Sequence, residues 1–533
     1  EDLQRSSSSG QFKMKKKKSK KSIETPTHAL SEHSEETPEI KIELMSNTSN
    51  DNNFKLAEKY YHGNEVPVDK KEAAKYYELS ANEGNDEAMF KLGLMLYKGD
   101  EIPQNKKEAL RYFENSMKVN DNSMYYYGLM CLNGEEQEVD KKKAAFYIEK
   151  AAVEGQVDAL YKYGTMLYEG EGVGEDKEKS SEFYKKAAEN GHVEAMFKYG
   201  QMLYQGDGIP SDKKSAAIYY QKAADLGHVE SMYNYSVMLQ KGDGIRSDKK
   251  ESAKYCKMAA DGGFVKGMLD YAYKLISADE IPVDKQESAK YFKLAADNGD
   301  LEAMFKYSVI LANGQGVQVD KKLAAEYCKK AADNGLVESM CFYSLRLKTG
   351  DGVEVDNVEA AKYCKMAADR DNVGALYRYG LILETGDGVD ANKKEAAKYI
   401  KKAADLGHPD AMYKYHVLLE DEEFVEKNKE ESAKYFEMAI NNNQKDANYE
   451  YALKLYEGTE DIPQDKAKSA KYFKIAADNG HIESMYKYAV MMNEGDGVEV
   501  DKEQAVRYFK TAAENGQLQA IHYYGIMLFK GLG

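Results

Sequence analysis

Short glycine-rich loops are the first residues in this sequence that could do chemistry, because such loops can bind a phosphate or a nucleotide. Loops of the form Gly-Asp-Gly begin at Gly206, Gly242, Gly350, Gly386 and Gly495. None is followed by the Gly-Lys-Ser/Thr of a P-loop, and none lies in the strand–loop–helix context that a dinucleotide site needs. We therefore interpret these loops as structural turns and expect no bound cofactor.

Four histidines could in principle bind a metal ion. His192, His228, His408 and His481 each follow a glycine, and they are separated by about one repeat of the sequence or by multiples of it. At that spacing, even the nearest two should be a full repeat apart, too far to share a metal. The acidic residues 496–501 lack the alternating oxygen ligands and the final glutamate of a calcium loop. We therefore interpret the histidines as turn residues and expect no metal.

The five cysteines indicate packing rather than redox or zinc chemistry. Cys256, Cys328 and Cys364 occupy one equivalent position, which Tyr220 and Phe292 fill in other repeats and Ile400 fills in another. Cys131 and Cys341 fall elsewhere, and no Cys-x-x-Cys occurs, so neither a zinc site nor a redox pair is predicted. An odd number of thiols favours a reducing compartment.

The sequence gives no catalytic residues. No Ser-His-Asp order and no isolated pair of carboxylates can be distinguished among so many acidic side chains. We expect no enzyme activity and no small-molecule substrate in this segment. The chain begins with Glu1 and stops where a further loop would begin, so we expect it to be part of a longer protein, in which any catalytic domain would lie outside this segment.

A repeat of about 36 residues organises the chain, and its clearest copy is Ala195–Glu230. Successive copies begin 35 to 37 residues apart. A period of this length predicts a solenoid, in which each unit buries its apolar face only against its neighbours. The small residue that opens the copy recurs at Ala88, Ser123, Ala159, Ala195, Ser231, Gly267, Ala303, Ser339, Ala375, Ala411, Ala447, Ser484 and Ala520.

Each repeat should contain two helices, here called the first and the second helix. Met196, Tyr199 and Leu203 share one side of a predicted first helix. Gly200 lies inside that helix, where glycine costs about 1 kcal/mol relative to alanine. We interpret it as a point of close contact with a neighbouring helix.

The two helices of a repeat are separated by a loop with recognisable ends. Gly206 should end the first helix in a left-handed conformation. Asp212 is a good N-cap for the second helix, which should run to about Asp225. Several second helices carry a glutamate three residues after the cap, which is the spacing of a capping box.

The shared pattern resembles the Sel1-like repeat, a relative of the tetratricopeptide repeat. In this chain it reads AxxxYGxMLYxGxGxxxDxxxAxxYYxKAAxxGH. The resemblance covers residues 52–533 and implies an all-α, right-handed α/α superhelical solenoid of about thirteen helix–turn–helix repeats plus a terminal half-repeat. It also implies a protein-interaction scaffold. Several bacterial members of the family join each repeat by a disulfide, which this chain has too few cysteines to do.

Residues 1–51 do not follow the repeat. They are basic at first and acidic later, with almost no aromatic residues, and we expect a disordered tail. The run Lys15–Lys21 fits a nuclear import signal, a patch for anionic partners or a solvated linker. The charges of the tail cancel, so the repeats carry the full net charge of −16, which disfavours nucleic acid as a ligand. No apolar run approaches a membrane span, and we expect a cytoplasmic, or through Lys15–Lys21 a nuclear, protein without membrane contact.

Tyrosine takes the place of the usual large aromatic residues, since the chain has 43 tyrosines and no tryptophan. Most tyrosines occupy three positions of the repeat, typified by Tyr147, Tyr161 and Tyr163. We expect these rings to fill the space between helices while their hydroxyl groups reach a rim.

The resemblance implies that the first helices line the inner curve of the solenoid, and this places a candidate binding face there. Aromatic side chains beside a row of cations on that face would suit an extended, partly acidic peptide. The alternative is that the aromatic rings belong to the core and the cations are simply solvated. The candidate residues are Tyr161, Lys162, Phe197, Lys198, Gln201, Tyr233, Phe305, Lys306, Tyr377, Arg378, Tyr413 and Lys414, with Val237, Val309, Leu381 and Val417 in the position of Gln201 and with Lys91 and Lys487 extending the row of cations.

Three functions remain open at this point. The first is a scaffold or adaptor, within a signalling protein for example. The second is a substrate-recruiting adaptor of endoplasmic-reticulum-associated degradation, for which a glycosylation sequence occurs at Asn47-Thr48-Ser49 in the tail. The third, a hydrolase of the kind claimed for some bacterial relatives, lacks a nucleophile.

Three places depart from the repeat pattern. The loop near residues 277–279 loses its first glycine, and Asp371 replaces the glycine between two repeats. The segment 420–427 has no glycine at all. Because the stability of a solenoid is a sum of local and nearest-neighbour contributions, we expect the chain to bend or fray first around residues 416–430.

Overall fold

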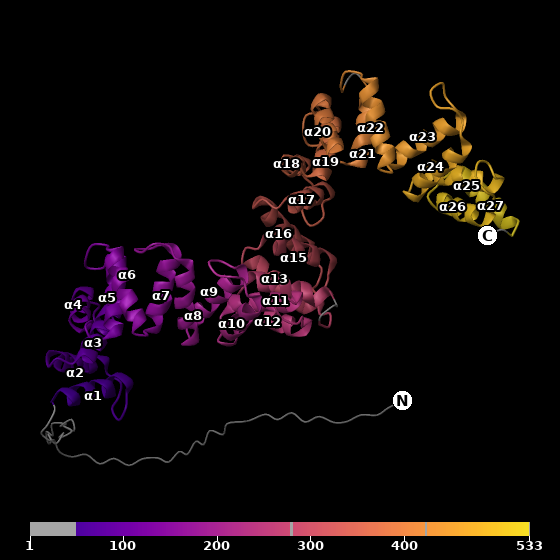
Figure 1. Ribbon diagram of the computed structural model, residues 1–533. Coiled ribbons are helices and arrows are strands. Elements are labelled where there is room, and N and C mark those ends of the chain that lie inside the picture. The colour runs from indigo at the N-terminus through magenta and orange to yellow at the C-terminus, as the bar shows by residue number, and fades with distance from the viewer. Residues whose placement is uncertain (1–48, 278–280, 422–423, 532–533) are drawn as a thin grey trace, which may run out of the picture. The chain divides into compact units, whose positions relative to one another are not determined.

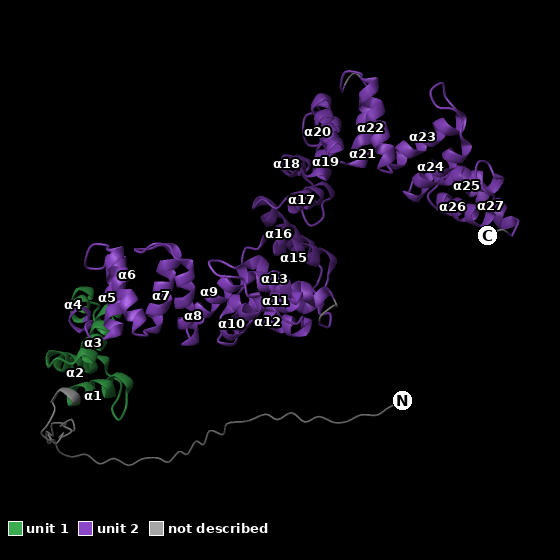
Figure 2. Ribbon diagram, in the orientation of Figure 1, with its two compact units in different colours: residues 1–112 green, residues 113–533 purple. Residues whose placement is uncertain are grey.

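The structure is a computed structural model that describes residues 49–277, 281–421 and 424–531, the first three of these as backbone only. The expected disordered tail lies outside the described residues, except for its last three, which belong to the first helix. By its contacts the chain forms two compact units, residues 1–112 and 113–533, and the division falls within one helix (Figure 2).

The described residues form 27 α-helices and no strand, ordered along the chain as thirteen pairs and one final helix (Figure 1). The first helices are α1 (Ser49–His62), α3 (Asp86–Lys98), α5 (Asp121–Asn133), α7 (Val157–Glu169), α9 (Val193–Gln205), α11 (Val229–Lys241), α13 (Val265–Ser277), α15 (Leu301–Asn313), α17 (Val337–Thr349), α19 (Val373–Thr385), α21 (Pro409–Leu418), α23 (Lys445–Glu457), α25 (Ile482–Glu494) and the unpaired α27 (Leu518–Phe529).

The second helices are α2 (Lys70–Asn82), α4 (Lys106–Ser116), α6 (Lys141–Val153), α8 (Lys177–Glu189), α10 (Lys213–Asp225), α12 (Lys249–Asp261), α14 (Lys285–Asp297), α16 (Lys321–Asp333), α18 (Asn357–Ala368), α20 (Lys393–Asp405), α22 (Lys429–Asn441), α24 (Lys466–Asp478) and α26 (Lys502–Glu514). The extensive helix–helix contacts in the described residues join neighbours along the chain. The prediction of an all-α solenoid of thirteen repeats and a half-repeat is confirmed.

The ends of the helices are those that the sequence predicts. Gly206 ends α9 with φ of 73°, and the Asp212 side chain accepts a hydrogen bond from the Ser215 N–H at 3.0 Å. The Asp212 N–H also donates to the carbonyl of Leu203, at 2.9 Å. That bond ties the start of the second helix to the first helix of the same repeat.

The capping-box prediction is only half right. Glu251 donates its N–H to the Asp248 side chain at 2.9 Å, as expected. The second half would need the backbone N–H of Asp248, but this group already donates to the carbonyl of Leu239, at 3.0 Å. The Glu251 carboxylate instead accepts from Lys254 at 2.8 Å.

Glycines inside the first helices mark close contacts, as predicted. A Cβ atom added at Gly200 would lie 3.2 Å from the ring of Tyr220 on the second helix. At Gly380 the same atom would lie 2.5 Å from Cγ1 of Ile400. A side chain at these positions would therefore push the two helices of the repeat apart.

The Gly-Asp-Gly loops join one repeat to the next. Asp207 accepts hydrogen bonds from the Tyr168 hydroxyl at 2.5 Å and from Lys177 at 2.9 Å, both in the preceding repeat. These two hydrogen bonds lower the pKa of the Asp207 carboxyl. The same arrangement recurs at Asp243 and Asp496. The interpretation of these loops as structural turns is confirmed, and they also hold successive repeats together.

Tyrosines fill the space between helices, as expected. Tyr163 is buried and packs edge-on against Phe183, with ring centroids 4.9 Å apart. On the second helices, tyrosine hydroxyls reach an aspartate at the end of the preceding second helix: Tyr255 donates to Asp225 at 2.7 Å and Tyr327 to Asp297 at 2.6 Å. Both predicted roles of tyrosine, the packed ring and the hydroxyl at a rim, are confirmed.

The cysteines form no disulfide, and most of them are buried as small side chains. Cys256, Cys328 and Cys364 are buried, and the thiol of Cys328 lies 3.5 Å from the carbonyl oxygen of Ser339. Burial raises the pKa of Cys328 to about 11 and that of Cys364 to about 12. Since the thiolate is the reactive form, these two thiols are inert at neutral pH.

The three places that depart from the repeat pattern differ in how far the structure departs from the other repeats. Residues 278–280 lie outside the described residues, so the loop near residues 277–279 is not described in full. Asp371 adopts the left-handed conformation of the glycine that it replaces, with φ of 59°. Helix α21 has 10 residues where α19 has 13. In the described residues we find no bond from the Asn428 N–H to the preceding first helix, although every other second helix has one.

We therefore expect amide hydrogen exchange to be fastest, among the repeats, in residues 416–430. The missing backbone bond and the short first helix remove local and nearest-neighbour stabilisation from this repeat. Mass spectrometry of exchange on the whole chain measures this directly, with residues 380–394 as the matched segment of the preceding repeat. Equal protection of the two segments would contradict the prediction.

Candidate binding face on the first helices

The predicted aromatic residues lie on α7, α9, α11, α15, α19 and α21, where they pack against the neighbouring repeat. Tyr161 stacks on His192 with ring centroids 4.4 Å apart, and Tyr377 packs on His408 at 4.7 Å. These rings are half-buried, whereas Phe197 is only 4% exposed. The structure thus places Phe197 in the core between repeats, where it supports the face from beneath.

The predicted cations lie beside these rings and mostly have partners within the chain. Lys414 pairs with Glu384 at 2.8 Å, and the Lys162 amine lies 3.6 Å from Glu171. Lys198 and Lys306 lie 5.5 Å and 5.8 Å from the centroids of aromatic rings. Arg378 has no ion-pair partner among the residues that the structure describes. The side chains of Lys414 and Lys162 are only 28% and 24% exposed, so an acidic ligand would have to displace the carboxylates that pair with them.

Acidic residues interrupt the row of cations, which the sequence reading missed. Asp270 and Glu450 occupy the same position of the repeat as Lys198. Asp270 accepts a hydrogen bond from the Tyr233 hydroxyl at 2.8 Å, and Glu450 accepts one from Tyr413 at 3.2 Å. Counting in steps of 36 residues from Lys198 would have found them. The face therefore carries charges of both signs along the chain, with cations in the majority.

A partly exposed apolar stripe follows the position of Gln201 along the first helices. Val237, Val309 and Leu381 are half-buried there, and Val417 is 43% exposed. The sequence reading missed Leu345, which occupies the same position on α17 and is 50% exposed. Its neighbour Phe342, which takes the position of the cations, is 48% exposed. These two residues make α17 the most apolar part of the stripe.

The four histidines are N-caps of the first helices. The ring nitrogen Nδ1 of His192 accepts a hydrogen bond from the Ala195 N–H at 3.1 Å. His228, His408 and His481 accept the equivalent bonds at 3.1 Å, 3.3 Å and 3.1 Å. In the described part of the chain, no cluster of three or more His, Cys, Asp or Glu side chains could hold a metal ion. The interpretation of the histidines as turn residues is confirmed, and capping is their structural role.

These caps predict a loss of stability on mild acidification. Burial lowers the pKa of His192, His408 and His481 below the ordinary value of 6.5, although nearby carboxylates partly oppose this. Because folding lowers the pKa of these histidines, the neutral rings stabilise the folded state at pH values above the unfolded-state pKa. This stabilisation is lost as the pH falls through the folded-state pKa. Protonated Nδ1 also cannot accept the capping bond. We expect a lower Tm at about pH 5.5 than at about pH 7.5.

The matched control replaces all four capping histidines with asparagine. Asn372 caps α19 from the same position, accepting from the Ala375 N–H at 2.9 Å. This variant should fold, and its Tm should fall less between the two pH values. Parallel thermal scans of the two proteins decide the question. If the Tm of both proteins falls equally between the two pH values, groups other than the capping histidines cause the pH effect.

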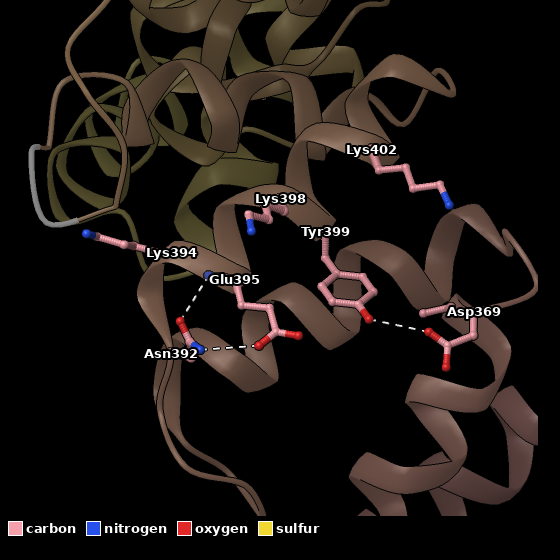
Figure 3. Close-up of a pocket in the computed structure, with 8 residues that line it drawn as sticks. Asp369, Asn392, Lys394, Glu395, Lys398, Tyr399 and Lys402 are labelled. Carbon is pink, nitrogen blue, oxygen red and sulfur yellow. Dashed lines mark hydrogen bonds between the residues drawn. The ribbon is translucent and has the colours of Figure 1, made fainter.

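A cavity with a volume of about 650 Å³ lies outside this face, near the second helix α20 (Figure 3). Its polar groups already bind one another: the Tyr399 hydroxyl donates to Asp369 at 3.3 Å and Asn392 donates to Glu395 at 3.2 Å. Figure 3 shows Lys394 and Lys402 extending away from these pairs. The arrangement leaves no convergent set of groups for a ligand.

Comparison with known proteins identifies the repeat. A sequence profile of the Sel1 repeat matches thirteen segments that together span most of residues 53–517. The chain belongs to the Sel1-repeat family. The matched segments are 53–85, 86–116, 121–155, 157–192, 193–228, 229–264, 266–300, 301–336, 337–372, 373–408, 409–444, 445–481 and 482–517.

Two solved structures show the same fold. The first is c5321, described as a protective antigen of uropathogenic Escherichia coli with an SLR fold; it is 24% identical, with a TM-score of 0.65 over 86% of this chain and 90% of that one. The second is a Sel1-repeat protein of Oxalobacter formigenes, also 24% identical, with a TM-score of 0.51 over 62% of this chain and 93% of that one. A search of curated proteins finds no match.

A Sel1-repeat solenoid is an architecture typical of protein–protein interaction scaffolds and is typically non-catalytic. Within the described residues, the Sel1-repeat helices are too short or too polar for any one of them to span a bilayer.

Proposed function

We propose that this Sel1-repeat chain is a scaffold or adaptor that binds partner proteins, or extended segments of them, along the first-helix face. The observation that carries the proposal is the apolar stripe, which the repeat presents at regular intervals beside partly exposed cations. Apolar contacts would supply affinity, and the cations would attract and align an acidic partner. Residues Tyr161, Lys162, Lys198, Gln201, Tyr233, Phe305, Lys306, Tyr377, Arg378, Tyr413 and Lys414 would contact the partner, with Phe197 behind them.

The proposal gives the chain no catalytic role and no nucleic-acid ligand. The net charge of −16 opposes phosphate binding. Cysteines that form no disulfide support a reducing compartment such as the cytoplasm. A partner held along this row of repeats, with its mixed charges, would be an extended polypeptide.

Reversing two charges on the first helices tests the proposal. The partner is first isolated by affinity purification of the chain from its own cells. Lys162→Glu combined with Lys198→Glu should then weaken its binding by about tenfold, because both cations lie on the proposed face. The matched control is Lys214→Glu with Lys322→Glu, two exposed lysines on second helices. Calorimetric titration that gives equal affinities for both double variants and the wild type would contradict the proposal.

A further inference from the structure

The first-helix face contains one cavity that differs from the rest of the solenoid, between α17 and α19. Both helices pack against α18, and the cavity has a volume of about 190 Å³. Leu345, Leu381 and Ile382 supply its apolar lining, and the side chains of Lys348 and Arg378 complete one side. No carboxylate is among the lining residues, although the chain as a whole has a net charge of −16.

The cavity exists because a small residue occupies a position that is usually large. Cys364 lines it, whereas the equivalent residues Tyr220 and Ile400 fill this space in other repeats. Cys328 is also small, but there Arg346 lies beside the thiol. Its charge slightly offsets the rise in the Cys328 pKa that burial causes. The residue equivalent to Arg346 in the next repeat is Ile382, whose shorter side chain leaves the space open.

Exposed apolar side chains extend from the mouth of the cavity. Phe342 and Leu345 are 48% and 50% exposed and lie one turn apart on the same side of α17. Phe305 on α15 packs edge-on against Phe342, with ring centroids 4.9 Å apart. Most other repeats place a cation or another polar group where Phe342 stands. A contiguous exposed apolar patch of this kind marks a site of interaction.

The charges at the cavity indicate what the partner carries. Lys348 is already paired with Asp387 at 2.8 Å. Arg378 has no ion-pair partner in the described residues, and its charge lowers the pKa of the nearby Cys364 thiol slightly against the effect of burial. An unpaired guanidinium beside an apolar cavity is complementary to a carboxylate held next to an apolar side chain.

We propose that this cavity is the anchor site of the solenoid, which takes one large apolar side chain of an extended partner segment while Arg378 binds an adjacent carboxylate of the same segment. The proposal rests on the proposed function and specifies the partner's chemistry: a polypeptide with leucine, methionine or phenylalanine within a residue or two of aspartate or glutamate. The other first-helix positions would then align the rest of the segment.

A library of random peptides displayed on phage and selected on the whole chain supplies the probe. Enriched peptides are synthesised with a fluorescent label, and their affinities are measured by anisotropy. We expect them to share the apolar–acidic pattern. Arg378→Glu and Leu345→Asp, both at exposed positions, should each weaken binding by about tenfold. The control Lys214→Glu on α10 should not change it.

A second variant tests whether the cavity itself contributes to peptide binding, apart from the attraction between charges. Ser344→Gly with Cys364→Ile copies the Gly380–Ile400 pair of the next repeat, so it should fill the cavity without changing surface charge or unfolding the chain. We expect it to weaken binding as strongly as Arg378→Glu does. Unfolding curves of the variants check that each is folded.

The outcomes distinguish this proposal from the wider one. Peptides that bind the cavity variants normally but lose affinity in the Lys162→Glu, Lys198→Glu variant would overturn the anchor site and leave the scaffold function standing. Peptides unaffected by every first-helix change, or a selection that enriches none, would count against both. If sedimentation instead shows a dimer that Arg378→Glu dissociates, the occupant is a second copy of the chain and the proposal of a partner segment is wrong.

Discussion

Replacing Gly352 with alanine is expected to destabilise the chain by about 3 kcal/mol, through both backbone strain and overpacking. Gly352 has φ of +81°, and an added Cβ would lie 2.0 Å from the carbonyl oxygen of Lys321, at the start of α16 in the preceding repeat. The loop cannot move away freely, because its Asp351 pairs with Lys321 and with Arg346, both at 2.9 Å. The substitution should therefore open the interface between two repeats.

Gly335→Ala is the matched control for this prediction. Gly335 also has a positive φ, +101°, but nothing lies within 4 Å of an added Cβ. This substitution should lower the free energy of unfolding by only about 1 kcal/mol, which is the contribution of backbone strain. Urea unfolding gives the difference between the two variants, and hydrogen exchange in α16–α18 locates it. If both variants lose the same stability, the loop does not hold the repeats together as described.

Gly380→Ala is expected to destabilise the chain by about 2 kcal/mol, although alanine favours helix by about 1 kcal/mol. The added Cβ would lie 2.5 Å from Ile400 Cγ1 and 3.2 Å from the Ala396 carbonyl oxygen. Ile400→Ala alone should cost about 3 kcal/mol, because it leaves a cavity. The double variant should cost less than the sum by more than about 1 kcal/mol, since the new methyl group fills part of that cavity.

Gly374→Ala serves as the control within the same helix. It lies at the start of α19, and the nearest atom to an added Cβ is Asn372 Oδ1 at 3.6 Å, an ordinary contact. This variant should be neutral or slightly more stable than the wild type. A double-mutant cycle measured by urea unfolding checks the coupling. Additive effects of Gly380→Ala and Ile400→Ala would mean that the two residues do not determine how closely α19 and α20 approach.

Most of the fold could be predicted from the repeat period, because each local sequence signal occurs in many copies of the repeat. Asp212 as N-cap, Gly206 as helix end and Gly200 as close contact each follow from a local rule, and the structure confirms all three. The capping-box prediction was only half right, for a reason that lies outside the capped helix. The backbone N–H of Asp248 is taken by a carbonyl on another helix, which the spacing of residues within one helix cannot reveal.

The candidate face was harder to predict, since exposure depends on the neighbouring repeat. Tyr161 and Phe197 occupy the same position, yet only Phe197 is buried. The hydrogen bonds from Tyr168 and Lys177 to Asp207 join residues 39 and 30 apart, and no pattern within one repeat indicates them. The cavity at Cys364 depends on the joint size of Ser344, Cys364 and Ile382, which come from three helices.

Site-specific photocrosslinking tests most directly whether partners bind the first-helix face. A photoreactive side chain is placed at Gln201 or Val237 on first helices, or at Ile218, which is 46% exposed on the second helix α10. The chain is then irradiated together with its purified partner. We predict crosslinks from positions 201 and 237 and none from position 218. Crosslinks from position 218 alone would contradict the binding face.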